Sequence, residues 1–441
     1  MTDMMTRTNT LTDLAVSVRQ TRSWTEPDWF LERRERGARR FAELGFPSQK
    51  LEEWKYTNLN AIAEAEYQVP GDEASVSADV LAEFEYGDLD AHRFVFVNGV
   101  FQPALSHLDK LPEGVIASTL GDAVATENET FREYFGAQAD IEKHHLTALN
   151  AALVQDGFFL AVAANTVVEK PFHLIFLTTG DGQPTIASLH NLVVLGTSAQ
   201  ATILETHGAA QTSRYLKNIV TEIAAAPNAH LDRYVVQRES VENGWHISSE
   251  YVHQDRDSNV RSHSLDFGGD IVRHNIWAKL DGEAAEAVLN GLYMLRGNQH
   301  VDNFMWVEHT KENIPSHELF KGILDERASA AFTGRIYVHK EAQRTDAKQT
   351  NQNLLLSDTA RANTRPQLEI YADDVKCTHG ATIGQLDEQA LFYLRSRGID
   401  PVQARNLLVH AFASDITERI RIPQVLDKAE ELLTARLGES K

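Results

Sequence analysis

The single cysteine of the chain, Cys377, is followed two residues later by His379, and this pair could do metal chemistry. A thiolate is a soft ligand that suits iron and iron–sulfur clusters, and imidazole suits iron as well. Two ligands cannot hold a cluster, which normally takes four cysteine thiolates. The pair is therefore either ordinary packing or part of a site whose other ligands come from another chain.

The backbone expected around this pair is compatible with both interpretations. Residues 368–375 have the composition of a strand, and side chains two residues apart in a strand project from the same face, as a shared site requires. Free cysteine is also among the most buried residue types, so Cys377 as a small hydrophobe in the core stays open at this point.

Motifs for nucleotide or acyl chemistry are missing from the sequence. It has no Gly-Lys dipeptide, hence no Walker A loop, and no Gly-x-Ser-x-Gly elbow. The glycine-rich segments 180–182 and 268–270 match ordinary turns. If the protein works in an ATP-driven process, another chain must carry the ATPase.

The 18 histidines raise the question of further metal sites. His144 and His145 fall in an expected helix, where adjacent side chains point apart, so they do not make one site. The pairs 308–309 (Glu-His) and 317–318 (His-Glu) could converge, although their spacing does not require it. We expect each of these histidines to be a solvated or packed side chain.

Composition limits the partners. The sequence has 63 acidic and 42 basic residues, and its net charge of −21 would repel a phosphate backbone, so we expect no nucleic-acid partner. One cysteine excludes an internal disulfide and fits a reducing compartment. No apolar run follows residues 1–7, and the longest apolar stretches, such as 158–164, fall far short of the roughly 20 residues that span a bilayer. We therefore expect a cytoplasmic protein without a membrane partner.

Residues 1–150 are expected to form a mixed, helix-rich N-terminal region. Helices are predicted over 27–45, which Gly45 and Pro47 would end, and over 144–153. Residues 93–98 predict a strand that closes on Asn98-Gly99, a strong turn dipeptide.

Residues 151–382 predict the β core. Short β-rich runs recur, separated by turns, and small-residue openings near Ser198, Pro227, Arg256 and Gly282 repeat with steps of 29, 29 and 26 residues. Such periods are typical of solenoids, because each coil leaves a strand face open that the next coil must cover. An antiparallel sandwich is the rival, which the pattern alone disfavours only slightly.

Residues 383–441 predict three helices. Asp387 can cap the first and Gly398 can end it, Asp400-Pro401 can open the second, and Pro423 can open the third. The second helix is expected to bury one apolar face, made of Ala404, Leu407, Leu408, Ala411 and Phe412. Helices this short must pack on the solenoid or on a partner.

Four stretches of the sequence resemble the SufB/SufD family of the SUF iron–sulfur cluster assembly system. They are residues 52–57 (EEWKYT), 316–322 (SHELFKG), 345–356 (TDAKQTNQNLLL) and a run from 369–382 (EIYADDVKCTHGAT) to 391–398 (LFYLRSRG). The resemblance covers most of the chain and is densest after residue 310. One cysteine, and Cys-Thr-His-Gly-Ala where SufB chains typically have Glu-His-Glu-Ala, point to the SufD branch of this family.

The resemblance implies a mostly β fold: a right-handed parallel β-helix (solenoid) core with helical N- and C-terminal regions. It also implies a non-catalytic scaffold that joins a SufB-like paralogue and a SufC-like ABC ATPase, with the ATPase docking on the C-terminal helices. Cys377 and His379 would then be transient iron or cluster ligands at the interface, completed by the partner chain. No stable cofactor is expected in the isolated chain.

Two rival functions belong to other classes. One is a self-sufficient homodimeric scaffold that binds a cluster with two copies of the pair. The other is an enzyme on a β-solenoid that uses Cys377 as nucleophile and His379 as base, which would also need an orienting group and a substrate cleft.

Overall fold

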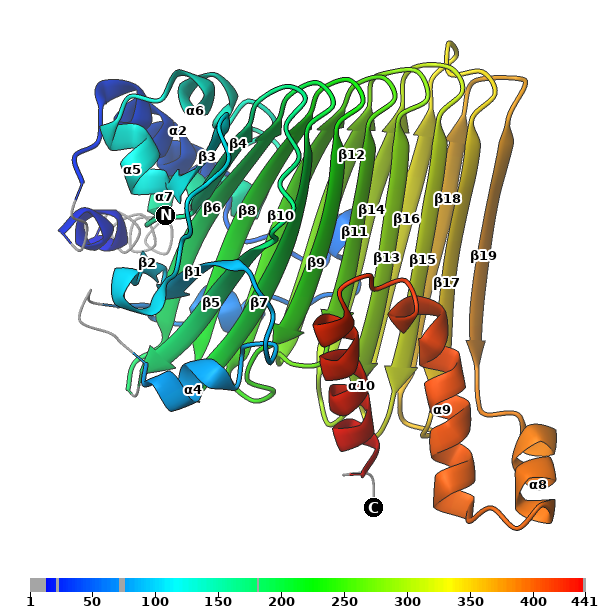
Figure 1. Ribbon diagram of the computed structural model, residues 1–441. Helices are drawn as coiled ribbons and strands as arrows, with labels where there is room; N and C mark the ends of the chain where they lie inside the picture. Colours follow the sequence, from blue (N-terminus) through cyan, green and yellow to red (C-terminus); the bar gives the residue numbers. More distant parts are fainter. Residues whose placement is uncertain (1–12, 21–23, 71–75, 181, 439–441) are drawn as a thin grey trace.

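The computed structural model describes residues 13–20, 24–70, 76–180 and 182–438. From β6 onward the chain alternates between two sheets, and each strand pairs in parallel with the strands two places away in the chain. This is a parallel β-solenoid, as predicted, and the antiparallel sandwich is excluded. Figure 1 shows the coils stacked side by side from the N-terminal helices at one end to β18 and β19 at the other.

The described strands fall into two sets. The first sheet contains β3 (Val115–Thr119), β4 (Phe158–Val162), β6 (Thr185–Leu195), β8 (Tyr215–Ala225), β10 (Gly244–Gln254), β12 (Ile271–Leu280), β14 (His300–His309), β16 (Ser329–Val338) and β18 (Arg361–Ile370). The second contains β2 (Val100–Phe101), β1 (His92–Val97), β5 (Phe172–Gly180), β7 (Gln200–Thr212), β9 (His230–Arg238), β11 (Asn259–Asp266), β13 (Glu286–Leu295), β15 (Pro315–Leu324), β17 (Asp346–Leu355) and β19 (Lys376–Gly384).

The predicted repeat corresponds to the turns at one edge of the solenoid. Ser198, Asn228, Asp257 and Ala284 each adopt a left-handed backbone with φ of 58–60°, a conformation that asparagine and aspartate tolerate best. The amide of Ser198 donates to the carbonyl of Pro227 in the next turn, and Asn228 donates in the same way to Arg256, both at 2.9 Å. Stacked turns of similar conformation therefore set the period seen in the sequence.

The N-terminal residues form the first coil and a helical cap. Helices α2 (Asp28–Leu44) and α7 (His145–Leu153) confirm the two predicted helices, and they pack on each other. The shorter helices are α3 (Asn60–Glu64), α4 (Ala78–Ala82), α5 (Leu120–Ala125) and α6 (Glu129–Tyr134). Strand β1 ends on the predicted Asn98-Gly99 turn and pairs in parallel with β5, so the solenoid begins within this region.

The C-terminal helices are α8 (Glu388–Ser396), α9 (Pro401–Thr417) and α10 (Pro423–Gly438). The side chains of Asp387 and Asp400 accept hydrogen bonds from the first turns of α8 and α9, which confirms both predicted caps. α9 and α10 lie against the outer face of the second sheet, where they form one apolar cluster with strands β7 to β17 (Figure 1). Ion pairs Lys321–Asp415 (2.5 Å) and Arg405–Asp325 (2.8 Å) hold α9 there.

The predicted buried face of α9 is partly wrong. The helix buries Ala404, Val409, Ala413 and Ile416 against the sheet, while Leu407 is 50% exposed and Ala411 faces solvent. α9 carries two apolar stripes. Contact with the strands beneath the helix decides which stripe is buried, and the sequence pattern alone does not show this contact. No residue of α8 is buried.

Candidate functional site: an open solenoid end carrying Cys377 and His379

The solenoid ends in two open edges. β19 is the edge strand of the second sheet and β18 is the edge strand of the first, so each presents one row of backbone groups without a strand partner in the described chain. Unpaired edges of this kind are templates for pairing with another chain.

Cys377 and His379 both lie on the open edge strand β19, so they share a face as expected. The strand predicted over 368–375 is partly wrong, because β18 ends at Ile370 and residues 371–375 connect it to β19. Parallel register places Cys377 beside Ala347 and His379 beside Gln349 of β17, both of which are buried. Registered neighbours share a face, so the pair continues the row of side chains that points into the solenoid. Because no further coil covers this row, His379 is exposed and Cys377 is only half-buried.

The surroundings of Cys377 are compatible with both interpretations made from the sequence, core packing and a shared metal site. Its side chain packs against a small apolar cluster that includes Ile336, Val338, Ala342 and Ala347. This burial raises the pKa of the Cys377 thiol, which favours the protonated form in the free chain. Formation of the Cys377 thiolate would therefore need a bound metal ion or a positive charge from a partner chain.

A buried polar row runs inward from His379. Gln349 donates to Glu318 of β15 at 2.5 Å, and the register aligns Glu318, Gln349 and His379 across three adjacent strands. Burial raises the pKa of Glu318 to about 8, although the hydrogen bond from Gln349 opposes this shift. Gly334 of β16 lacks the side chain that would otherwise occupy the space of Gln349.

The other histidine candidates have separate partners. His144 contacts the Tyr251 hydroxyl at 2.7 Å and His145 contacts the carbonyl of Gly45 at 2.8 Å, so they do not form one site. Glu308 bonds His339 at 2.6 Å, and His309 bonds Ser316 at 3.1 Å. Among the described residues, Glu308, His309, His317 and Glu318 are not part of a group that could hold a metal ion.

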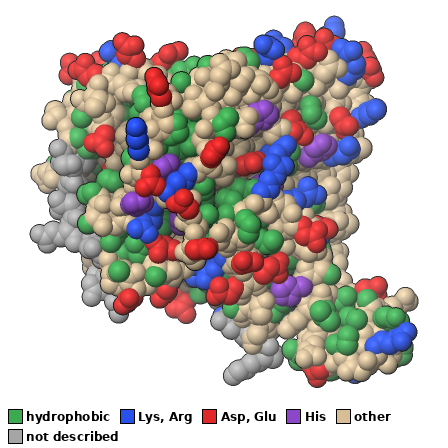
Figure 2. All heavy atoms as spheres, viewed as in Figure 1, with side chains coloured by type: hydrophobic (Ala, Val, Ile, Leu, Met, Phe, Trp, Pro, Cys, Tyr) green, Lys and Arg blue, Asp and Glu red, His purple; other side chains and the backbone are tan. Residues whose placement is uncertain are grey.

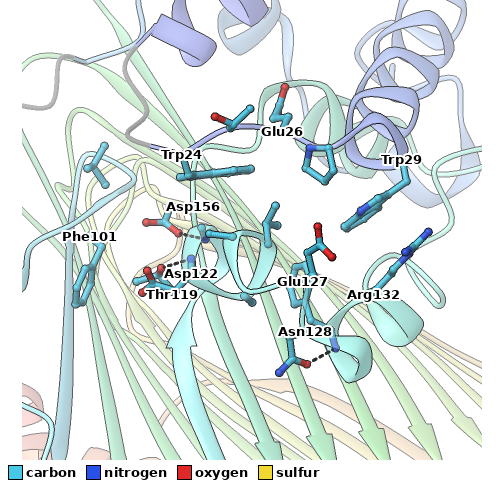
Figure 3. Close-up of a pocket in the computed structure, with 18 of the residues that line it drawn as sticks. Trp24, Glu26, Trp29, Phe101, Thr119, Asp122, Glu127, Asn128, Arg132 and Asp156 are labelled. Atoms are coloured by element: carbon cyan, nitrogen blue, oxygen red, sulfur yellow. Dashed lines mark hydrogen bonds between the residues drawn. The ribbon is translucent and has the colours of Figure 1, made fainter.

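A hollow of about 900 Å³ lies at the opposite end of the molecule, beside the first coil. Figure 3 shows Trp24 near the Asp156 carboxylate, with Trp29 and Arg132 on the other side of the hollow. Burial raises the pKa of Asp156 to about 7, and the amide of Gly157 donates to its carboxylate at 2.9 Å. None of the candidate site residues named from the sequence lines this hollow.

Three of the stretches quoted for the family resemblance come together at the open end. Residues 316–322, 345–356 and 376–382 lie on or beside β15, β17 and β19, which are consecutive strands of one sheet. Segment 52–57 crosses the outside of the first sheet: the Arg273 guanidinium stacks 4.3 Å from the Trp54 ring, and Glu52 pairs with Arg365 of β18 at 2.9 Å.

Comparisons of the sequence with known proteins point to one family. The family model described as "SUF system FeS cluster assembly, SufBD core domain" matches residues 176–412, and the "SufBD protein N-terminal region" matches residues 5–174. An iron–sulfur cluster assembly SufBD family protein of Synechocystis is 34% identical, covering 94% of this chain and 92% of the relative. The iron–sulfur cluster assembly protein SufD of Escherichia coli is 33% identical over 90% of this chain and 89% of the relative. SufD of Bacillus subtilis is 26% identical over 91% and 92%.

No helix among the described residues is long and apolar enough to cross a membrane. Family models match nearly the whole chain, and relatives at 33–34% identity extend over nine-tenths of it. The chain therefore belongs to the SufBD family of iron–sulfur cluster assembly proteins and is SufD-like.

Proposed function

We propose that this protein is a non-catalytic, cytoplasmic scaffold subunit of a SUF-type assembly complex. In this proposal it pairs with a SufB-like paralogue through its open solenoid end and docks a SufC-like ABC ATPase through its C-terminal helices. Cys377 and His379 serve the nascent iron–sulfur cluster, which is cargo and not a resident cofactor.

The observation that carries this proposal is the position of the pair on the open edge. A paralogue with the same fold could add strands to both β18 and β19, since each edge offers a full row of backbone donors and acceptors. Cys377 and His379 would then lie within the junction, close to ligands supplied by the partner.

Ligand counting supports a shared site. The pair supplies one thiolate and one imidazole, and their backbone positions are about 6.6 Å apart along the strand, close enough to serve one centre. A cluster that normally needs four thiolates must obtain its other ligands from the partner chain.

The surface of α8 supports the docking of the ATPase. Phe392 is 72% exposed and Tyr393 is 57% exposed, and on the neighbouring α9 Val402 is 58% exposed. Figure 2 shows hydrophobic side chains gathered on the lobe that α8 forms at the lower right. Large exposed apolar side chains grouped in this way mark interaction surfaces.

Anaerobic co-expression with a SufB-like paralogue and a SufC-like ATPase tests the pairing. Ile383→Lys places a charge on the open edge, and Val167→Lys is the matched control because both residues are about half exposed and Val167 lies near the first coils. We expect Ile383→Lys to lose the paralogue on size exclusion while Val167→Lys keeps it. A complete complex with Ile383→Lys contradicts the proposal. A dimer of the chain alone that Ile383→Lys disrupts, with no heterocomplex, favours the homodimeric scaffold.

A further inference from the structure

A second group of metal-ligand side chains lies in the middle of the solenoid, far along the sheets from Cys377. His207 of β7, Glu239 after β9 and His246 of β10 are buried, and one ligand atom from each lies within 4.8 Å of the other two. A small cavity lined by His207 and His246 also contacts strands of both sheets. The group is therefore inside the solenoid, between the sheets.

The spacing of these atoms is close to that of a metal site. Nδ1 of His246 lies 3.3 Å from Oε1 of Glu239. Ligand atoms around a tetrahedral zinc ion, with bonds of about 2.0–2.1 Å, are separated by roughly 3.4 Å. The ligand atom of His207 lies within 4.8 Å of the other two, so the three side chains would have to close slightly around an ion.

Two further observations point to a bound ligand. Nδ1 of His207 is buried and has no hydrogen-bond partner, which is costly unless water or an ion fills that position. The adjacent cavity of about 30 Å³ has room for one water molecule or one ion. Uncharged histidines hydrogen-bonded to carboxylates would account for the Glu239–His246 contact and for the contact of Nε2 of His207 with Glu205 at 3.4 Å, but not for Nδ1 of His207.

A positive charge already lies beside Glu239. The Lys217 ammonium is 2.6 Å from Oε1 of Glu239 and also donates to the carbonyls of Phe176 (2.9 Å) and Gly208 (3.3 Å). The Tyr215 hydroxyl donates to the other carboxylate oxygen at 2.6 Å. An ion would share Glu239 with Lys217, so the lysine charge must weaken binding, and removing it must strengthen binding.

We propose that His207, Glu239 and His246 bind one divalent first-row transition-metal ion, such as Zn²⁺, Co²⁺ or Fe²⁺, inside the solenoid. Two imidazoles and one carboxylate are a donor set that suits these ions. The ion would connect β7 of one sheet with β10 of the other. This site is independent of the cargo proposed for Cys377 and His379.

The test is the metal content of full-length protein purified from cells grown with added Co²⁺. We expect about one Co²⁺ per chain, with the visible absorption of a tetrahedral ion. The double variant His207→Ala/His246→Ala should lose the ion, whereas His263→Ala, at a buried histidine that contacts Asn290 and Tyr234, should keep it. Cys377→Ser/His379→Ala should also keep it, which separates this site from the proposed function.

Lys217→Met should hold the ion more tightly than wild type, in contrast to the histidine variants. Without the competing ammonium, Co²⁺ should leave the protein to a chelator about tenfold more slowly or slower still. Circular dichroism of each variant checks that it is folded. The proposal is overturned if wild type and His207→Ala/His246→Ala carry the same amount of cobalt, if wild type carries none, or if folded Lys217→Met loses cobalt faster than wild type.

Discussion

At the residue scale, the position of Cys377 and His379 supports the proposal that this pair, too small to bind a cluster alone, serves one together with a partner chain. β19 places both on the inward row, and the end of the solenoid leaves that row uncovered. Strand alternation could be predicted from the sequence. That β19 is an edge strand could not, because sheet order depends on which coil is last.

Glu318 gives a prediction for stability against pH. Its pKa in the folded chain is raised to about 8, so the folded state retains a proton that the unfolded state loses as pH rises above its ordinary value of 4.5. The contribution of Glu318 to stability is therefore fully present below that value and is lost as pH rises towards 8, by about 1.4 kcal/mol per pH unit for a fully retained proton.

Glu318→Gln should flatten this dependence, because the amide stays neutral throughout. Urea unfolding at pH 5 and pH 8 should show the variant gaining stability relative to wild type at the higher pH. Glu341→Gln, at an exposed position, is the control and should run parallel to wild type. Parallel curves for Glu318→Gln would show that this carboxyl is ionised in the folded protein.

The cluster of His207, Glu239 and His246 could not be predicted from the sequence either. His207, Glu239 and His246 come from two sheets and a loop, and no spacing pattern connects them. The sequence gives a partial indication of a buried polar site, because Glu205 and His207 occupy alternate positions of a buried strand.

At the element scale, the helix caps and turns were predictable, whereas the packing of the helices was not. Asp387 and Asp400 cap their helices through local hydrogen bonds that sequence alone specifies. The choice between the two apolar stripes of α9 depends on residues of β13 and β15 far away in the chain. For the same reason the sequence predicts where helix α8 lies in the chain, but not that none of its residues is buried.

Substitutions on α8 should separate ATPase docking from folding. Phe392→Asp/Tyr393→Asp should weaken association with the SufC-like ATPase by at least about tenfold, since exposed aromatic side chains dominate such interfaces. The melting temperature should hardly change, because neither side chain is buried. Val409→Asp, inside the packed stripe of α9, is the contrasting variant and should lower the melting temperature. Normal pull-down of the ATPase by the folded α8 variant would show that docking lies elsewhere.

At the scale of the whole molecule, the proposed function makes the chain one half of a shared site. The isolated protein should bind no stable iron–sulfur cluster, because even two copies supply only two thiolates. It should also not hydrolyse ATP, since its sequence has no phosphate-binding loop. Anaerobic reconstitution with iron and sulfide assays, together with phosphate release, checks both. A stoichiometric cluster that survives chromatography on the isolated chain would contradict shared ligation.

Cluster formation in the assembled complex tests the central claim most directly. His379→Ala and Cys377→Ser should leave the complex intact and cost about 1 kcal/mol or less in stability, because His379 is exposed and Cys377 is half-buried. Iron and acid-labile sulfide per purified complex should nevertheless fall far below wild type in both variants. His317→Ala, a histidine on β15 outside the inward row, should match wild type. Full cluster content with His379→Ala, or a loss of clusters that merely follows a loss of stability, would contradict the account.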